Sequence, residues 1–262
     1  MYTENEDNEA ANQRIFPVWS FWKTLAISAF ILVIGNVLVQ VLVLAIHMAT
    51  EMYKIQNFSL DLRVLQAYAG NLFQKSSAVS QTILISDLFS VLLIIYFVRR
   101  KTPLNMKGYL GFNPVKPLPF MMWQVIMVAF FFGMNYIVSQ TSVEEPEFMK
   151  FMRDMLATES LAALIMMLLA LVGAAPLFEE MLFRGFMYTG MLYSSLGIIG
   201  AICIPSLFWS LIHVQYEWIW IAMIFFTGIM FTLARHLTGS IYTVIAMHAI
   251  NNFLSFVDIL KK

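Results

Sequence analysis

The sequence predicts an all-α membrane protein, a transmembrane helical bundle of about seven to eight spans. Of its 262 residues, 60% are hydrophobic and only 12% are charged, whereas a soluble domain has about a quarter of its residues charged. The hydrophobic residues are also gathered into runs that approach or exceed the ~20 residues needed to cross a bilayer. Composition and run length together indicate a polytopic membrane protein.

Seven runs are long and apolar enough to be candidate spans. They are residues 25–46, 81–98, 118–138, 161–193, 197–214, 218–233 and 241–257. The run 161–193 is too long for one straight span at about 1.5 Å per residue, and we expect Pro176 to kink or divide it. Its division would raise the count to eight.

The chain is expected to have three parts. Residues 1–20 form a polar tail on the cytosolic side, residues 21–159 form N-terminal transmembrane helices, and residues 160–262 form a C-terminal catalytic core. Between the first two spans, Glu51–Val79 mixes leucines with charged residues. This mixture predicts an amphipathic helix lying at the membrane interface.

Basic residues in the loops predict the orientation of the chain. The loop Arg99–Lys116 contains five lysines and arginines, whereas Ser139–Ser160 is acidic overall. Because basic loops stay in the cytosol, we expect Arg99–Lys116 and the N-terminus to be cytosolic. With seven spans, Lys261 and Lys262 would lie outside, against this rule for basic residues. This is a second reason to consider eight spans.

Composition also excludes several classes of function. The formal net charge is zero, so nothing predicts a nucleic-acid partner. The single cysteine, Cys203, can form neither an intrachain disulfide nor a thiolate metal site by itself.

Polar residues inside the apolar runs are the candidates for function. A charged side chain at the bilayer centre costs about 2.5–3.5 kcal/mol on insertion scales and is a functional candidate by default. Asp87 is one such residue, although a structural acid paired with a neighbouring helix would explain it equally simply. Most of the others lie in the last third of the chain: Glu179, Glu180, Arg184, His213, His248, Asn251 and Asn252.

Helical spacing separates the two adjacent acids. Glu180 and Arg184 are four residues apart, so their side chains can meet on one face of a helix. Glu179 is rotated by about 100° around the same helix and is not naturally paired by this arginine. The sequence therefore predicts one ion pair and one free carboxylate.

Straight-helix geometry brings some of these residues to similar depth. Glu179 and His213 are each 17 residues from Leu196, in a predicted turn, so a helical hairpin would place them opposite each other. His248 and Asn252 share a helix face, but they lie fewer residues from the turn that precedes their own helix than Glu179 and His213 lie from Leu196. At about 1.5 Å per residue, His248 would be roughly 10 Å shallower than His213.

Such a set of side chains is suited to amide hydrolysis. A glutamate and a histidine can remove a proton from water, and a second histidine and an asparagine can donate hydrogen bonds to the oxyanion of an attacked carbonyl. The set Glu179, His213 and His248 could equally ligate zinc with an activated water. No Gly-x-Ser-x-Gly or His-Glu-x-x-His motif is present, so the residues leave both versions open.

Three short motifs in these runs resemble one family. They are Glu179-Glu180-Met-Leu-Phe-Arg184, Trp209-Ser-Leu-Ile-His213 and His248-Ala-Ile-Asn-Asn252, with Thr238-Gly-Ser240 before the last. The chain from about Leu161 to Phe256 resembles the CPBP family of intramembrane endopeptidases, which comprises CAAX prenyl proteases and the bacteriocin-processing or self-immunity proteins of the Abi family. The family motif has phenylalanine where this chain has Trp209.

The resemblance implies a role for each matching residue. Glu179 and His213 would activate the water, and His248 and Asn252 would form the oxyanion hole. Glu180 and Arg184 would support them. The expected enzyme is an intramembrane endopeptidase with no cofactor, or alternatively a zinc metalloprotease that uses Glu179, His213 and His248.

The expected partners are the lipid bilayer and a membrane-associated or lipidated peptide or protein substrate. We expect an integral protein of a prokaryotic plasma membrane. Two other functions remain open: a non-catalytic scaffold or bacteriocin-immunity protein that acts by binding, and a proton-coupled transporter. No repeated half is visible in the sequence, although such repeats are common in transporters.

Overall fold

A computed structural model describes residues 18–54, 61–157 and 159–261. All regular elements in these ranges are helices, which confirms the all-α class. Most of the predicted polar tail, residues 1–17, lies outside the described residues. The predicted division at residues 159 and 160 stays a prediction.

The first half of the chain begins with a long helix that runs without a break through α2 (Phe21–Phe30), the π-helical segment η1 (Ile31–Leu38) and α3 (Val39–Lys54). The elements that follow are α4 (Leu62–Phe73), α5 (Ser76–Lys101), α6 (Met106–Leu110), α7 (Pro117–Ser139) and α8 (Glu147–Leu156).

The second half begins with another unbroken helix, Leu161–Leu192. Its parts are α9 (Leu161–Leu168), η2 (Leu169–Ala174), α10 (Ala175–Glu180), η3 (Met181–Met187) and α11 (Tyr188–Leu192). Three helices complete the chain: α12 (Gly197–Leu211), α13 (Trp218–Thr238) and α14 (Ile241–Lys261).

Six helices in the described part are long and apolar enough to cross a membrane. They correspond to six of the seven predicted spans. The remaining one, predicted at 197–214, is the shorter apolar helix α12. Its 15 residues extend about 22 Å at 1.5 Å per residue, which is less than the ~30 Å hydrocarbon core.

Pro176 does not divide the fourth predicted span. The helix Leu161–Leu192 is continuous through it, because the π-helical turn η2 ends at Ala174, immediately before α10. Proline lacks an N–H and its ring crowds the preceding turn, and local π geometry is one way in which a membrane helix accommodates it. Division at Pro176 therefore does not raise the span count to eight.

Two segments differ in detail from the expected loops. The predicted interfacial segment Glu51–Val79 contains the end of α3, the helix α4 and the beginning of α5. The acidic loop predicted at Ser139–Ser160 contains α8, whose Met152, Met155 and Leu156 are buried against the C-terminal part of α14. A one-sided apolar helix gains stability from this packing.

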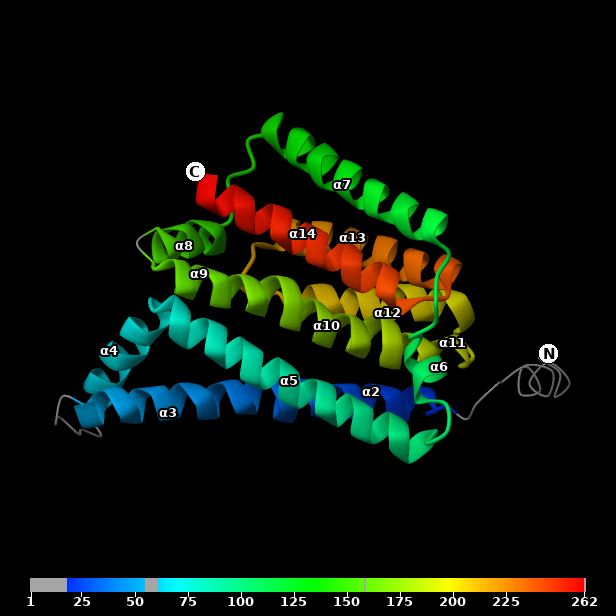
Figure 1. Ribbon diagram of the computed structural model, residues 1–262, viewed down its shortest axis with the longest axis horizontal. Helices are drawn as coiled ribbons and strands as arrows, with labels where there is room; N and C mark the ends of the chain where they lie inside the picture. The colour runs from blue at the N-terminus through cyan, green and yellow to red at the C-terminus, as the bar shows by residue number, and fades with distance from the viewer. Residues whose placement is uncertain (1–17, 55–60, 158, 262) are drawn as a thin grey trace, which may run out of the picture.

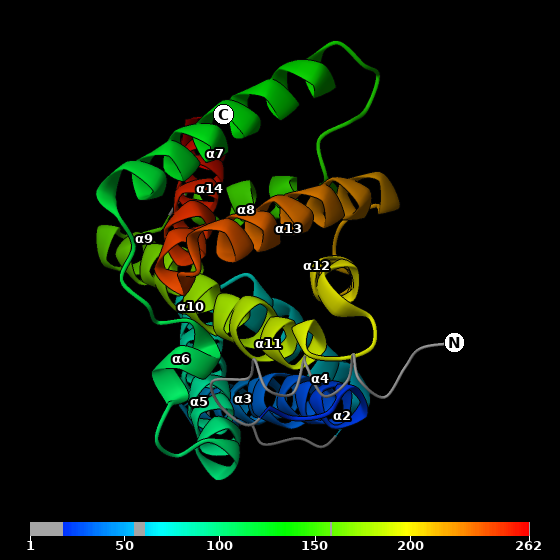
Figure 2. The same cartoon turned by 90° about the vertical axis from the view of Figure 1, so that its right-hand side faces the viewer.

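The helices form layers, which Figure 1 shows edge-on. The first helix and α5 lie together on one side, the helix α9–α11 and α12 lie in the middle, and α13 and α14 follow. In both views α7 lies at the outer edge, beyond α14 (Figures 1 and 2). The main hydrophobic core joins the N-terminal helices to the middle layer, from Val18 to Met247.

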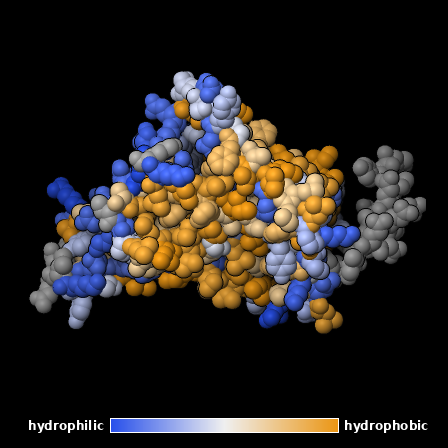
Figure 3. Space-filling view, turned by 45° about the horizontal axis from the view of Figure 1, so that its top comes forward, coloured by the Kyte–Doolittle hydropathy of each residue, from blue (hydrophilic) through white to orange (hydrophobic). Residues whose placement is uncertain are grey.

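The outer surface of the bundle is strongly apolar. Large hydrophobic side chains such as Trp22, Val41 and Leu92 are more than half exposed. Figure 3 shows a face on which hydrophobic residues form a broad middle region and hydrophilic residues gather toward the ends. A broad exposed apolar region of this kind marks a surface that contacts an apolar environment or partner. With six apolar helices, it identifies an integral membrane protein; its predicted orientation and membrane stay predictions.

The turn between α13 and α14 is tied to the segment after α6. The side chain of Ser240 donates to the Asn113 carbonyl at 2.6 Å, and the Ile241 amide donates to the Gly111 carbonyl at 2.7 Å. Gly111 has φ +81°, and a Cβ there would lie 2.1 Å from the Arg235 guanidinium. Glycine is therefore required by both backbone conformation and space.

Candidate active site

The predicted ion pair forms on the middle helix. Arg184 Nη1 donates to Glu180 Oε1 at 3.0 Å, and both side chains are completely buried. The pair spans the junction of α10 and η3. Two buried opposite charges with a hydrogen bond avoid most of the cost of leaving either one alone.

The rest of the arginine is held by α13 and by aromatic rings. Its Nη2 donates to the Gly228 carbonyl at 3.2 Å, and its Nε donates to Thr232 Oγ1 at 3.4 Å. The guanidinium lies over the Trp209 ring, 4.5 Å from its centroid. A Cβ on Gly228 would lie 3.1 Å from the arginine, so this glycine allows α13 to approach closely.

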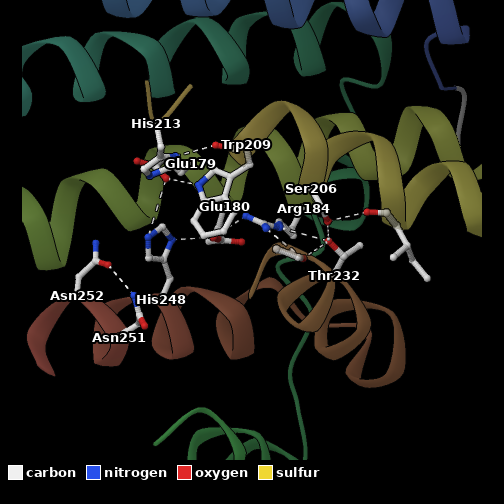
Figure 4. Close-up of polar contacts among 12 residues, drawn as sticks. Glu179, Glu180, Arg184, Ser206, Trp209, His213, Thr232, His248, Asn251 and Asn252 are labelled. Atoms are coloured by element: carbon white, nitrogen blue, oxygen red, sulfur yellow. Dashed lines mark hydrogen bonds and ion pairs between the residues drawn. The ribbon is translucent and has the colours of Figure 1, made fainter. Parts of the chain in front are cut away.

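His248 connects the ion pair to the free acid. Its Nδ1 is 2.8 Å from Glu180 Oε1, and its Nε2 is 3.9 Å from Glu179 Oε2 (Figure 4). The ring is buried beside Trp209 and Phe231. In Figure 4, α14 carries His248 toward the two glutamates, and both dashed contacts leave the one imidazole ring.

The two histidines meet beside one side chain, although straight-helix geometry places His248 roughly 10 Å shallower than His213. That geometry assumes straight helices that begin at their turns and run parallel. In the structure α12 is short, ends at Leu211 and leaves His213 in the following turn. Both histidine rings pack edge-on against one indole, that of Trp209.

Glu179 is not paired by Arg184, as the helical spacing predicts. Its Oε2 instead accepts a short hydrogen bond from Trp209 Nε1. Its side chain is 15% exposed, whereas that of Glu180 is 0% exposed. The two adjacent acids thus have different environments: Glu180 is enclosed in an ion pair, and Glu179 reaches a cavity.

His213 is oriented by the backbone of the preceding turn. Its Nδ1 is 2.7 Å from the Trp209 carbonyl, and a carbonyl oxygen can only accept a hydrogen bond. Nδ1 therefore carries the proton. In a neutral imidazole this leaves Nε2 as an unprotonated acceptor, which is the form that a general base requires.

Asn252 is held differently from the prediction. Its Nδ2 donates to the Leu171 carbonyl at 2.8 Å, and its Oδ1 accepts from Asn251 Nδ2 at 3.3 Å. Leu171 lies in the π-helical segment η2. Figure 4 shows Asn252 and His248 rising from the same side of α14, with no dashed line between them. The asparagine lines the same cavity but makes these bonds rather than one to a glutamate or histidine.

Four predicted site residues, Glu179, His213, His248 and Asn252, line one cavity of about 730 Å³. Helices from both halves of the chain contribute to its wall, including η1, α5, α7 and α14. Tyr216 also lines it, beside His213. Burial, and then the charge of Glu179, raise the pKa of Tyr216 to about 12, so its phenol remains a neutral hydrogen-bond donor at physiological pH.

The arrangement of side chains gives no support to the alternative zinc site. Within the described ranges, no group of three His, Cys, Asp or Glu side chains is placed so that it could hold a metal ion. Glu179 Oε2 accepts from Trp209, and His248 Nε2 lies 3.9 Å from that oxygen.

Comparison with known families agrees with the motifs. Residues 161–254 match the family model described as type II CAAX prenyl endopeptidase Rce1-like. This segment is Rce1-like. The match contains both glutamates, Arg184, both histidines and Asn252, and it confirms the predicted family. No curated protein and no solved structure matches the chain.

The family is one of proteases, so the Rce1-like segment supports a membrane-embedded protease acting on a peptide. Sequence reasoning treated Trp209 as a packing residue and missed its bond to Glu179. An indole in place of the motif phenylalanine was the available signal, because a buried indole N–H usually finds a partner. The contacts of Arg184 with Gly228 and Thr232 gave no signal in the sequence.

Proposed function

We propose that the protein is an intramembrane endopeptidase in which Glu179 and His213 activate the attacking water. One observation supports this above others: a partly exposed glutamate and two histidines surround a single indole on the wall of one cavity. The substrate is a peptide segment at or within the membrane, because the cavity lies among apolar helices.

The position of the proton on the His213 ring determines how this residue takes part in the first step of hydrolysis. Its Nδ1–H is bound to the Trp209 carbonyl, so Nε2 accepts a hydrogen bond from the water. Glu179 removes the proton of that water as the oxygen attacks the peptide carbonyl. When the carbon–nitrogen bond breaks, the leaving amine takes this proton from Glu179, and the carboxylate is restored.

His248 is placed to stabilise the negative oxygen of the intermediate. Glu180 accepts from its Nδ1, and when Nε2 is also protonated the imidazolium has a buried carboxylate as its counter-ion. The cluster of Glu179, Glu180, Arg184 and His248 is then neutral, which limits its cost in a low-dielectric region. Nε2–H can donate to the oxyanion, and a preorganised donor of this kind is a large term in such reactions.

Asn252 serves as a second donor in this proposal. A side-chain amide nitrogen carries two N–H groups. One of them donates to the Leu171 carbonyl, and this bond fixes the amide while the other N–H remains for the oxyanion. The neutral phenol of Tyr216 is a further donor on the same wall.

Cleavage by the purified protein is the direct test. The full chain in detergent or lipid vesicles is mixed with membrane-inserting reporter peptides in water enriched in ¹⁸O, and the products are analysed by mass spectrometry. We expect cleavage with one heavy oxygen in the new carboxyl group. Peptide capture without cleavage would instead favour the scaffold or immunity protein.

Removal of metal ions tests the zinc alternative. We expect activity to be unchanged after treatment with a strong chelator and dialysis, because the proposed water is activated by Glu179 and His213 alone. A loss of activity that zinc restores, with about one zinc per chain by elemental analysis, would contradict this mechanism and support the metalloprotease.

Substitution of Trp209 by phenylalanine tests the positioning of Glu179. The change keeps an aromatic ring against Arg184 and His213 but removes the N–H donor. A hydrogen bond to a charged group contributes about 1.5–3 kcal/mol, so we expect kcat to fall at least about tenfold. The melting temperature should change little.

The matched control for this prediction is Trp220→Phe. Trp220 also lines the cavity, on α13, and makes no contact with Glu179 in the proposal. We expect its kcat to remain close to the wild-type value. Equal rates for Trp209→Phe and Trp220→Phe would show that the indole acts only by packing.

A further inference from the structure

The wall of the cavity contributed by the N-terminal helices contains a buried acid that the proposed reaction does not use. Asp87, in α5, is only 3% exposed. Its Oδ1 accepts from Asn36 Nδ2 at 2.9 Å, and Asn36 Oδ1 accepts from Gln40 Nε2 at 2.9 Å. The three side chains come from two helices and form one hydrogen-bonded chain.

Close packing of these helices holds the chain in place. A Cβ on Gly35 would lie 2.8 Å from Ser90 Oγ, so the absence of a side chain at Gly35 brings η1 against α5. Asn36 follows directly in the π-helical segment. Gln40 Nε2 is also 3.4 Å from Ser86 Oγ, one residue before Asp87.

One oxygen of this acid lacks a bond. Among the described residues, Asp87 Oδ2 is buried and has no hydrogen-bond partner. Most buried polar atoms are bonded, so each exception requires an explanation. Asp87 lines the same cavity as Glu179, His213 and His248. A ligand group that reached Asp87 from this cavity would supply the missing bond.

Several acids line the cavity. The described residues that line it include four acids and no lysine or arginine: Asp87, Glu145, Glu179 and Asp258. Glu145 forms an ion pair with Arg153, which also interacts electrostatically with Asp258. Asp87 has no such ion pair with a lysine or arginine among the described residues that line the cavity.

We propose that Asp87, positioned by Asn36 and Gln40, forms a substrate subsite for a positively charged hydrogen-bond donor. The group is the ammonium or guanidinium of a basic residue near the cleaved bond of the peptide. A cation supplies the missing bond to Oδ2 and offsets the negative charge of the cavity. The proposal rests on the proposed protease function and adds the class of substrate.

Cleavage of matched peptides tests the subsite. Membrane-inserting peptides of one apolar sequence carry lysine, norleucine or glutamate at a single position, which is moved through each position flanking the cleaved bond. At one position we expect lysine to raise kcat/KM about tenfold over norleucine, and glutamate to lower it. Tenfold corresponds to about 1.4 kcal/mol, as one charge-assisted hydrogen bond gives.

Asp87→Asn should remove this preference. The asparagine keeps the size of the side chain and can still accept from Asn36, so we expect kcat/KM for the lysine peptide to fall to that for the norleucine peptide. Asn135→Leu is the control: it lines the same cavity on α7 but carries no charge, and it should keep the lysine preference.

Two results would overturn the subsite: no lysine preference at any position in the wild type, or the same preference in Asp87→Asn. Failure of the protease proposal is distinguishable, because then no peptide is cleaved. In that case the fluorescent lysine and norleucine peptides are bound to Glu179→Gln and to Glu179→Gln/Asp87→Asn. Tighter binding of the lysine peptide only when Asp87 is present supports the subsite, and equal binding rejects it.

Discussion

Replacement of Glu179 by glutamine is expected to lower the rate of peptide hydrolysis on the order of 10³-fold, within the usual range for loss of a general base. Glutamine has the shape of glutamate and its carbonyl oxygen can still accept from Trp209 Nε1. It cannot take the proton of the water. The loss should therefore appear in kcat, while KM and the melting temperature remain near the wild-type values.

The matched control is Glu217→Gln. Glu217 precedes α13 and accepts from the backbone amide of Glu147 at 3.4 Å, at an exposed position. We expect this variant to have wild-type activity. Hydrolysis by Glu179→Gln within a few-fold of the wild-type rate would contradict the proposed role of Glu179 as the base, whatever the behaviour of the control.

Replacement of Arg184 by methionine is expected to produce the largest loss of stability. The guanidinium is completely buried and bonded to Glu180, Gly228 and Thr232. Its removal leaves the Glu180 carboxylate buried with only His248 as a partner. Breaking a buried ion pair costs about 3–5 kcal/mol, and we expect a similar decrease in the free energy of unfolding, measured by thermal or denaturant unfolding in detergent.

The double variant Glu180→Gln/Arg184→Met separates stability from activity. Without the acid, no unpaired buried charge remains, so we expect the double variant to recover at least about 1 kcal/mol relative to Arg184→Met, a coupling typical of residues in contact. Activity should stay low, because His248 Nδ1 then loses its charged partner. Recovery of both properties together would show that Glu180 does not orient His248.

The control for this pair is Arg153→Gln. Arg153 forms an ion pair with Glu145 in which both side chains are about a quarter exposed. Exposed and partly exposed pairs contribute about 0–1 kcal/mol. We expect a correspondingly small change in unfolding free energy. A decrease for Arg184→Met as small as that for Arg153→Gln would contradict the account of the buried pair.

Properties that depend on neighbouring residues along one helix could be predicted. The apolar runs predicted the membrane class and most of the long helices, because each span is a local property of about 20 residues. The pairing of Glu180 with Arg184, and the separation of Glu179 from it, followed from helical spacing. The motif residues of the Rce1-like segment were identified by their order and type.

Predictions that extended straight-helix geometry over a long segment of the chain were less successful. The depth expected for His248 assumed straight, parallel helices and did not anticipate that both histidines contact Trp209. Of the kink or division expected at Pro176, the division was wrong, because η2 accommodates the proline within one helix. π-Helical segments and helix crossing change which way a side chain points, and neither is visible in hydrophobic periodicity.

The sequence alone thus determined that this is a helical membrane protein with a protease-like segment and with one paired and one free acid on the same helical turn. Tertiary structure alone decided that Trp209 binds the free acid, that His248 joins the two acids, and that Asp87 lines the same cavity as Glu179. The physical reason is that these partners lie on different helices. Their contacts depend on how each helix is rotated and crossed in the packed bundle, and local spacing does not contain that information.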